Sequence, residues 1–178
     1  IVPFRGEYYM LNDHACHLVN NLIYPVPDPR FPFLGAHFTR TIGGAIEAGP
    51  NAVLAWSREG YSKTDIDLKD IWDYLSYGGF WNMARKYWPI AIGEYYRSFF
   101  KVAFVKELQK LIPEITKDDI SKSPSGVRAQ ALAPDGSLLD DFVISNLKNM
   151  IHVINAPSPA ATSSFAIGEH ISNIYFEK

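Results

Sequence analysis

Short apolar runs alternate with turn residues over the first sixty residues, a pattern typical of an antiparallel sheet. The first pair of runs flanks the polar segment 12–14 and predicts a hairpin, and the second pair flanks the turn 41–43 and predicts another. Between the hairpins, residues 25–32 hold four prolines, which exclude a helix and predict an extended loop. The paired runs are 1–9 with 17–24, and 34–40 with 44–48.

Between residues 66 and 115 the spacing of apolar residues becomes helical. Ile71 and Leu75, followed after the interruption Gly78-Gly79 by Met83 and Tyr87, recur at intervals of three to four or multiples of these. A second helix is predicted after Pro89, and Pro113 is expected to end it. Its apolar side comprises Ile92, Tyr96, Phe99 and Ala103, and its charged side Glu94, Arg97 and Lys101. The region is therefore expected to be helical.

The same region is dense in aromatic side chains, and two interpretations of them remain open. The rings either pack helices onto the sheet, or form an amphipathic surface that rests on a membrane or a partner, because faces of aromatic residues and lysine suit such an interface. The rings belong to Trp72, Tyr74, Tyr77, Phe80, Trp81, Tyr87, Trp88, Tyr95, Tyr96, Phe99, Phe100 and Phe104.

Beyond Ser123, three further runs predict short strands, the first two separated by the turn Pro134-Asp135-Gly136. A segment of small residues follows the last run and predicts a helix that begins at Pro159. Sheet and helices follow one another rather than alternating, so the fold class expected is α+β. The runs are 127–132, 142–145 and 150–155.

Composition and charge narrow the range of partners. The 178 residues are 47% hydrophobic, enough for a domain with a proper core. Seventeen basic and nineteen acidic residues give a net charge of −2 with no basic run, which argues against nucleic acid as a partner. No apolar stretch approaches the ~18 residues that span a bilayer. A single cysteine, Cys16, cannot form an internal disulfide and suggests a reducing compartment.

A metal site is not expected from the sequence. The segment 13–17 offers two histidines and Cys16, but no second ligand pair stands elsewhere at a suitable spacing. An ordinary loop is the prediction for this segment.

The junction NAPSPAATSSFAIG, at 155–168, offers chemistry for binding an anion or an electron-rich ring. A helix that starts there directs backbone N–H groups at whatever lies before it. Such donors suit a phosphate, a carboxylate or the edge of a reduced flavin, and the small side chains of Ala160 and Ala161 let a flat ring approach.

Arg128, in the segment SGVRAQ, is the first candidate for binding a substrate. Its planar guanidinium can hold a carboxylate through two parallel hydrogen bonds. The alternative from the residues alone is a surface or structural arginine.

Six blocks, in order along nearly the whole chain, resemble the flavin-dependent L-2-hydroxyglutarate oxidases and dehydrogenases of the D-amino-acid-oxidase-like superfamily. A divergent gap from about residue 62 to 123 separates the third block from the fourth. The blocks are IVPFRGEYY (1–9), LIYPVPDPRFPFLGAHFTR (22–40), GPNAVLAWSREGY (49–61), SGVRAQAL (125–132), DGSLLDDFV (135–143) and NAPSPAATSS (155–164).

This resemblance implies a division of the chain. Residues 1–120 are expected to form a substrate-binding domain, an antiparallel mixed sheet over 1–60 with helices over 66–115. Residues 121–178 are expected to form the C-terminal part of an FAD-binding α/β domain. Members of the family hold FAD on a G-x-G-x-x-G turn, which this sequence lacks. We therefore expect a fragment of a longer enzyme, without FAD and inactive by itself.

The resemblance also assigns roles to residues. Arg128 is expected to bind the substrate's α-carboxylate, and His37 is the candidate base, because the ordinary pKa of histidine, ~6.5, lies near working pH. Arg40 and Tyr61 are candidates for binding the distal carboxylate. The sequence does not rank them above five other candidates, Arg5, Arg58, Lys63, Tyr8 and Tyr9. The residues expected at the cofactor are Arg5, Gly6, Gly126, Asn155, Ala156, Pro157, Ser158, Pro159, Ala160, Ala161 and Thr162. For Arg5, a structural pairing with Glu7 is the alternative.

The activity implied is FAD-dependent oxidation of the CH-OH group of L-2-hydroxyglutarate to 2-oxoglutarate. The electron acceptor is expected to be oxygen or a membrane quinone or carrier, and the location cytoplasmic, with peripheral association with the inner membrane. One alternative is a related flavoenzyme acting on an amino acid or glycerol 3-phosphate. Another, of a different class, is a non-catalytic module that binds a partner or a membrane through the aromatic helices.

Overall fold

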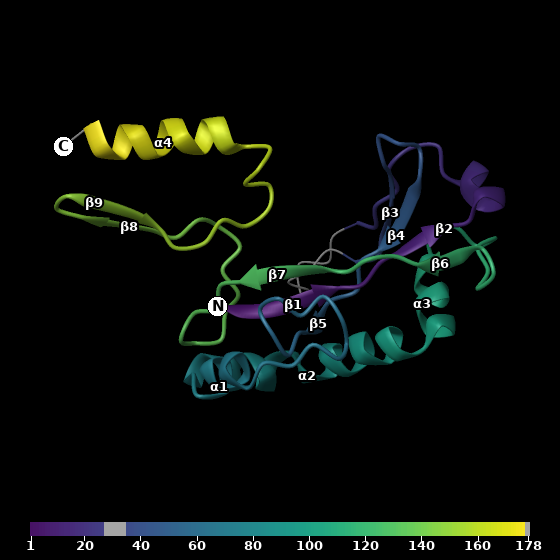
Figure 1. Ribbon diagram of the computed structural model, residues 1–178, viewed down its shortest axis with the longest axis horizontal. Helices are drawn as coiled ribbons and strands as arrows, with labels where there is room; N and C mark the ends of the chain where they lie inside the picture. Colours follow the sequence, from purple (N-terminus) through teal and green to yellow (C-terminus); the bar gives the residue numbers. More distant parts are fainter. Residues whose placement is uncertain (27–34, 177–178) are drawn as a thin grey trace.

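A computed structural model describes residues 1–26 and 35–176 and has the expected α+β fold (Figure 1). Two small antiparallel sheets form the body, with strand orders β5-β1-β7 and β3-β4-β2-β6. Helices α1 and α2 run along one side of the first sheet, and the C-terminal hairpin and α4 lie on the other side (Figure 1). Most of the predicted proline-rich loop, residues 27–32, lies outside the described residues.

The first sheet is built around β1 (Val2–Gly6), with β5 (Val53–Leu54) on one edge and β7 (Gly126–Gln130) on the other. Phe4 lies opposite both Leu54 and Arg128, and Gly6 lies opposite Gly126. The strand predicted at 127–132 is thus confirmed, and it joins the N-terminal and C-terminal parts of the chain.

The second sheet contains the hairpin predicted around residues 41–43. Strands β3 (His37–Arg40) and β4 (Ile46–Gly49) pair with Arg40 opposite Ile46, and Gly44 in the turn has φ +86°. That left-handed conformation favours glycine. On the other side of β4 lie β2 (Tyr9–Leu11) and β6 (Ile120–Lys122). Leu34, the expected start of β3, lies outside the described residues.

The other predicted hairpin is wrong. The run 17–24 does not pair with 1–9; residues Asp13–Leu18 form a 3-10 helix, and Ile23 makes an isolated bridge with Phe38. The backbone N–H of Ala15 bonds to the carbonyl of Asn12, 2.8 Å away, which starts the turn and buries Ala15 and Val19 in the core. Burial of these two side chains favours the helical turn over a strand.

The helical region is confirmed, with different boundaries. It comprises α1 (Leu68–Leu75), α2 (Gly78–Phe99) and α3 (Lys101–Leu108). The Asp67 side chain caps α1 by accepting hydrogen bonds from the backbone N–H groups of Lys69 and Asp70. At Gly79 a Cβ atom would lie 2.5 Å from the carbonyl oxygen of Ala133. The glycine at the predicted interruption therefore also lets α2 approach the backbone at Ala133 closely.

Pro89 does not separate two helices, as the sequence had suggested, because α2 continues through it. A proline inside a helix removes one hydrogen bond to the carbonyl four residues earlier, here that of Arg85. Both residues are exposed, so water can satisfy that carbonyl. The helix breaks instead at Phe100, which has extended backbone angles, and α3 ends at Leu108, before Pro113.

The core consists of two clusters. One lies between the second sheet and α3 and includes Phe38, Ile46, Phe104 and Leu108. The other lies between β1 and the α1–α2 pair, and its buried members are Val2, Tyr74, Phe80, Met83 and Leu132. Some of the aromatic residues of the helical region are therefore core.

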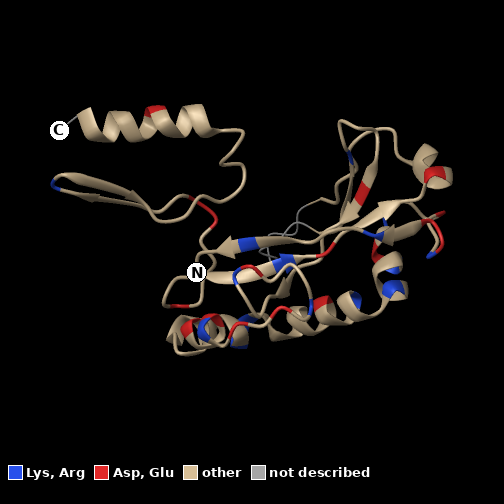
Figure 2. Cartoon of the chain, in the orientation of Figure 1, with Lys and Arg blue, Asp and Glu red and all other residues tan. Residues whose placement is uncertain are grey.

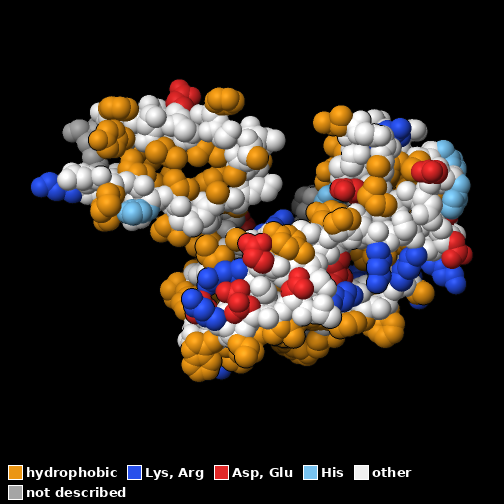
Figure 3. Space-filling model, in the orientation of Figure 1, with side chains coloured by type: hydrophobic (Ala, Val, Ile, Leu, Met, Phe, Trp, Pro, Cys, Tyr) orange, Lys and Arg blue, Asp and Glu red, His pale blue; other side chains and the backbone are white. Residues whose placement is uncertain are grey.

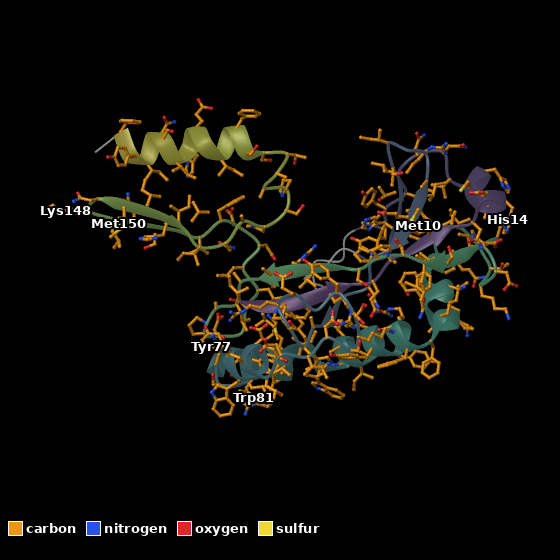
Figure 4. The ribbon with its side chains drawn as sticks, viewed as in Figure 1. Met10, His14, Tyr77, Trp81, Lys148 and Met150 are labelled. Atoms are coloured by element: carbon orange, nitrogen blue, oxygen red, sulfur yellow. The ribbon has the colours of Figure 1, made fainter. Side chains whose placement is uncertain are left out.

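Other aromatic residues of that region are on the surface. The side predicted to be apolar faces outward, whereas Glu94 and Arg97, on the charged side, are half-buried and paired with each other. Figure 3 shows the exposed apolar side chains along the lower edge of the molecule, and Figure 4 places Trp81 there. The exposed set includes Trp72, Trp81, Trp88, Ile92, Tyr96, Phe99 and Phe100.

The C-terminal part forms a hairpin of β8 (Ile144–Leu147) and β9 (Met150–Val153), followed by α4 (Ser164–Phe176). Lys148 lies at the tip of the hairpin and Met150 beside it (Figure 4). Of the described residues after Gly136, Asn155 alone is buried. The strands are confirmed, but α4 begins five residues later than predicted, because the carbonyls of Pro157 and Pro159 accept turn bonds from Ala160 and Ser163 first.

Candidate functional site

A small cavity of about 190 Å³ lies at the end of the β1–β7 pair. Gly6 and Gly126, which face each other across the pair, line it together with Arg128 and Tyr8. A Cβ atom added at Gly126 would meet nothing within 4 Å, so the backbone here is bare and faces open space. Four residues named from the sequence, Arg5, Gly6, Gly126 and Arg128, thus line one cavity.

A larger cavity of about 780 Å³ adjoins the first and is mostly apolar. The two cavities share four lining residues, Phe4, Pro50, Asn51 and Ala52. On its other side the larger cavity is bounded by α2, where no residue from Ala84 to Arg97 is buried. Along this stretch the helix reaches the sheet through the hydrogen bonds of Tyr95 with Leu54 and of Glu94 with Ala52, and it otherwise leaves room beside the shared wall.

The shared wall, residues 50–52, is held by side chains rather than by sheet bonds. Asn51 exchanges hydrogen bonds with Glu7, and the backbone N–H of Ala52 donates to the carboxylate of Glu94 on α2, 3.0 Å away. Gly49, which leads into the wall, has φ +141°, and a Cβ there would lie 2.9 Å from the carbonyl oxygen of Glu7. A glycine is therefore required at this entrance.

Arg5 is buried, with 3% of its surface exposed, and takes part in this polar network. Its guanidinium donates to Oε1 of Glu7, at 3.0 Å, and to the carbonyl oxygen of Ser62, at 2.9 Å. The pairing of Arg5 with Glu7, the structural alternative raised by the sequence, is present. Arg5 nevertheless lines the small cavity, so its charge contributes to the local potential there.

Arg128 is exposed and lies on β7 opposite Phe4. Its charge acts on Tyr8: burial raises the pKa of the Tyr8 hydroxyl, Glu47 raises it further, and Arg128 partly opposes both. Tyr8 therefore stays protonated at neutral pH and can donate a hydrogen bond into the cavity beside a guanidinium. This pair can bind a carboxylate by a fork and a hydroxyl.

His37 lies near this region but does not line either cavity. It stands on β3 opposite Gly49, and its ring stacks on that of Tyr24 with the centroids 4.4 Å apart. Its Nδ1 is 3.0 Å from the carbonyl oxygen of Gly35, so the hydrogen bond requires the proton on Nδ1 and leaves Nε2 as the acceptor. The neighbouring residues Gly35 and Ala36 do line the larger cavity.

Arg40 and Tyr61 are not brought to either cavity wall. Arg40 donates to the carbonyl oxygen of Val19, at 3.2 Å, at the far end of β3. Tyr61 is exposed, and a hydrogen bond with Glu59, together with the charge of that carboxylate, raises its pKa.

The segment 155–162 also lies away from the two cavities. The Asn155 side chain accepts from the backbone N–H of Val143, at 2.6 Å, and donates to the carbonyl oxygen of Asp141, at 2.9 Å, which ties β9 to the chain before β8. Residues from Ala156 to Thr162 form the turns that lead into α4.

Sequence reasoning missed the residues that the two cavities share. Phe4, Pro50 and Asn51 stood inside recognisable blocks, but nothing in the sequence pairs Asn51 with Glu7, 44 positions earlier. The signal available was the Gly49-Pro50 pair, which marks a special turn.

The cavity residues fit a flavin. The open backbone at Gly126 leaves space for a flat ring, and Arg5 and Arg128 supply positive charge beside it. For a metal ion the described residues offer no group of three or more histidine, cysteine, aspartate or glutamate side chains. Nor does the described part of the chain contain a helix long and apolar enough to cross a membrane.

Residues 1–174 match the family model described as FAD dependent oxidoreductase (DAO). The chain is 56% identical over 168 residues to L-2-hydroxyglutarate dehydrogenase from Indibacter alkaliphilus. The match covers 94% of this chain and 42% of that protein. It is 51% identical over 178 residues to the mitochondrial human enzyme of that name, covering 97% of this chain and 38% of the relative. For the Salmonella houtenae enzyme the identity is 46% over 171 residues, and the match covers 96% of this chain and 40% of that protein.

The chain spans about two fifths of the length of these curated relatives. The family match nevertheless extends over nearly all of its residues and agrees with the α+β fold and with the flavin-compatible cavity. This chain belongs to the family of FAD dependent oxidoreductases.

Proposed function

We propose that this chain provides the substrate side of an FAD-dependent enzyme that oxidises L-2-hydroxyglutarate to 2-oxoglutarate. The observation that carries the proposal is the cavity in which Arg128 and Tyr8 stand beside the open backbone of Gly126. The three relatives compared above are all named L-2-hydroxyglutarate dehydrogenases, which supports the choice of substrate.

Arg128 binds the α-carboxylate of the substrate in this proposal. Its two parallel hydrogen bonds fix the direction of the C2–H bond, and the Tyr8 hydroxyl adds a third donor. Orientation is the main requirement here, because the oxidation removes the hydrogen on C2 and the fork fixes the direction in which that hydrogen points. FAD, when bound, supplies the acceptor for that hydrogen.

His37 is proposed as the base. The hydroxyl proton of the substrate would pass to Nε2 of His37 as the carbonyl of 2-oxoglutarate forms, and FAD, if bound, would take up the hydride from C2. The hydrogen bond of Nδ1 to the Gly35 carbonyl leaves Nε2 as the basic atom. Because His37 does not line the cavities, this role requires that the complete site bring the substrate to it, directly or through a water molecule.

The remaining residue roles are proposals that rest on the family resemblance. Arg40 and Tyr61 are assigned to the distal carboxylate, and the turns from Asn155 to Thr162 to the edge of the flavin. The division into a substrate domain, 1–120, and part of an FAD domain, 121–178, is likewise proposed. The pairing of β7 with β1 means that the two parts would share a sheet.

Peripheral association with a membrane, with a quinone or another carrier as electron acceptor, is also proposed. Three of the exposed side chains on the helical face are tryptophans, Trp72, Trp81 and Trp88. Residues 78–110 hold six basic and two acidic side chains, a net charge of +4 in a chain of net charge −2. Figure 2 shows basic residues on α3. Aromatic rings beside basic groups suit an anionic lipid surface.

A substrate panel tests the proposed reaction. The flavin-loaded holoenzyme is given L-2-hydroxyglutarate, its D-enantiomer, L- and D-amino acids and glycerol 3-phosphate, while flavin reduction and product are followed. We expect reduction with L-2-hydroxyglutarate alone, and 2-oxoglutarate as the product. Reduction by an amino acid or glycerol 3-phosphate instead would assign another substrate, and no reduction by any of them would favour a binding module.

Vesicle sedimentation tests the membrane proposal. The holoenzyme is expected to sediment with vesicles of anionic phospholipid more than with neutral vesicles, and Trp88→Ser should weaken that binding. Equal behaviour with the two vesicle types would contradict it.

A further inference from the structure

We propose that Glu7 and Asn51 form a positioning pair, which holds the shared wall 50–52. The pair thereby sets the width of the small cavity, the gap in which Arg128 binds the substrate. This inference rests on the proposed function for the identity of the substrate. Neither residue needs to touch the substrate for the effect, since the pair acts through the wall.

The pair is reciprocal, with Asn51 buried and Glu7 half-buried. The backbone N–H of Glu7 donates to Oδ1 of Asn51, at 2.8 Å, and Nδ2 of Asn51 donates to Oε2 of Glu7, at 3.0 Å. A third bond runs from the backbone N–H of Asn51 to the carbonyl oxygen of Glu7, at 3.3 Å. Asn51 is only 5% exposed, so water does not compete for these bonds.

The wall needs such a pair because the sheets do not hold it. Strand β4 ends at Gly49 and β5 begins at Val53, so the three residues between them lie outside both ladders. Pro50 has no backbone N–H to donate. The other fixed point is the bond from Ala52 to Glu94, which anchors the end of the wall to α2. Loss of the Glu7–Asn51 side-chain bonds would leave the middle of the wall held only by the backbone bond from Asn51 to Glu7.

Glu7 is surrounded by groups that keep it in place. Its Oε1 accepts from Arg5 at 3.0 Å, and the ammonium of Lys63 lies 3.7 Å from the same oxygen. Its charge also acts on the hydroxyls of Tyr9 and Tyr95 and raises their pKa values, secondary in each case to burial. Oε1 is thus committed to cations, and Oε2 is left for Asn51.

The substitution Asn51→Asp tests the pair at almost constant shape. It keeps the acceptor for the N–H of Glu7 but places a second carboxylate against Oε2. The two like charges repel each other at neutral pH, whereas at lower pH one shared proton can restore the hydrogen bond. A role limited to filling space would give no such dependence on pH.

Two readouts on the flavin-loaded holoenzyme separate the steps of the proposal. Hydrogen exchange of the backbone N–H groups in peptide 49–54 reports directly on the wall and needs no substrate. The affinity for 2-oxoglutarate, followed by perturbation of the flavin absorption band, reports on the gap. For Asn51→Asp at pH 8 we expect faster exchange and a Kd raised about tenfold or more, the size of one lost buried bond to a charged group. Both should return toward the unsubstituted values near pH 5.

The swapped double variant, Glu7→Gln with Asn51→Asp, provides a rescue. The amide oxygen introduced at position 7 can still accept from Arg5, and its NH₂ group can donate to the new carboxylate at position 51. We expect this variant to recover slow exchange and a low Kd at pH 8. Because it retains every donor and acceptor of the pair, it also decides the question if Asn51→Asp alone fails to fold.

Asn12→Asp is the matched control. The Asn12 side chain donates to the carbonyl oxygen of Asp118, at 2.7 Å, and lines neither cavity, so neither readout should change. Unchanged exchange in Asn51→Asp, faster exchange without a change in Kd, or no rescue by the swap would each overturn the proposal. If the unsubstituted holoenzyme binds no diacid, the proposed function fails instead, and the affinity is then measured with whichever compound of the panel reduces the flavin.

Discussion

Single side chains give the small cavity its chemistry. Arg128 offers a charged fork, Tyr8 a hydroxyl whose pKa is raised above its ordinary value, and Gly126 an absence of side chain that leaves the backbone bare. Arg5, although it lines the same cavity, is engaged by Glu7 and by the carbonyl of Ser62. These two partners hold Arg5 in the polar network beside the cavity.

Removing the Tyr8 hydroxyl tests its part in binding. Tyr8→Phe should raise the KM for L-2-hydroxyglutarate several-fold, because one donor to the carboxylate is lost while the ring stays in place. Steady-state kinetics at pH 7 measure the change, with Tyr175→Phe on α4 as a control. A KM equal to that of the unsubstituted holoenzyme would exclude Tyr8 from substrate binding.

Asp119 makes one side-chain contribution to the pH dependence of stability. Hydrogen bonds from the side chain and backbone of Thr116, and then from His14, lower the pKa of Asp119 below 3.8. A carboxyl whose pKa is lowered in the folded state stabilises it above the unfolded value and loses that contribution as pH falls through the folded value. Asp119→Asn should therefore flatten the dependence of the free energy of unfolding on pH below about pH 4.

Denaturant unfolding at several pH values checks this expectation, with Asp118→Asn as the neighbouring control. An unchanged slope in Asp119→Asn would contradict it. His14, at the far end of the molecule from α4 in Figure 4, places this effect away from the two cavities.

For single residues, the sequence predicted those that stand in family motifs and missed a pair that forms only through a contact between distant positions. Arg128, Gly6 and Gly126 were identified from family blocks and do line one cavity. The Glu7–Asn51 pair was not identified, because it depends on the path of the chain between β4 and β5.

At the scale of elements, local patterns identified the helical region but not its orientation. The apolar stripe that includes Ile92, Tyr96 and Phe99 faces outward, because Glu94 is drawn inward by the N–H of Ala52 and by Arg97. Periodicity shows that a helix has two sides; which side is buried depends on partners distant in sequence. The β3–β4 hairpin was predicted correctly since its turn chemistry is local.

Substitution of one ring on each side of the helical layer tests this assignment of faces. Trp88, 60% exposed, should tolerate Trp88→Ser with a change in the free energy of unfolding of about 0.5 kcal/mol or less. Phe104 is buried in the first cluster, so Phe104→Ala should lower the free energy of unfolding by roughly 3–5 kcal/mol. Chemical denaturation of both variants measures the difference. Comparable losses would show that the outward face is in fact covered.

At the scale of the whole molecule, both core clusters lie in the body, and Asn155 is the one buried residue among those described after Gly136. The α4 helix contains no buried residue, although Phe165, Tyr175 and Phe176 are among its side chains. The hairpin and α4 lie beyond the first sheet on the side opposite α1 and α2 (Figure 1). Sequence patterns predicted the strands here but placed the start of α4 too early, since proline-rich turns resemble the first turn of a helix.

Arg128 is proposed to hold the substrate of a flavin-dependent hydroxy-acid oxidation, and anaerobic rapid mixing tests this role. The oxidised flavin band of the holoenzyme is followed after mixing with L- or D-2-hydroxyglutarate, for the unsubstituted protein and for Arg128→Lys. We predict fast bleaching with the L-enantiomer alone, and for Arg128→Lys slower reduction at a raised half-saturating concentration, because a point charge loses the fork. Bleaching of equal rate and concentration dependence in the two proteins would contradict this role.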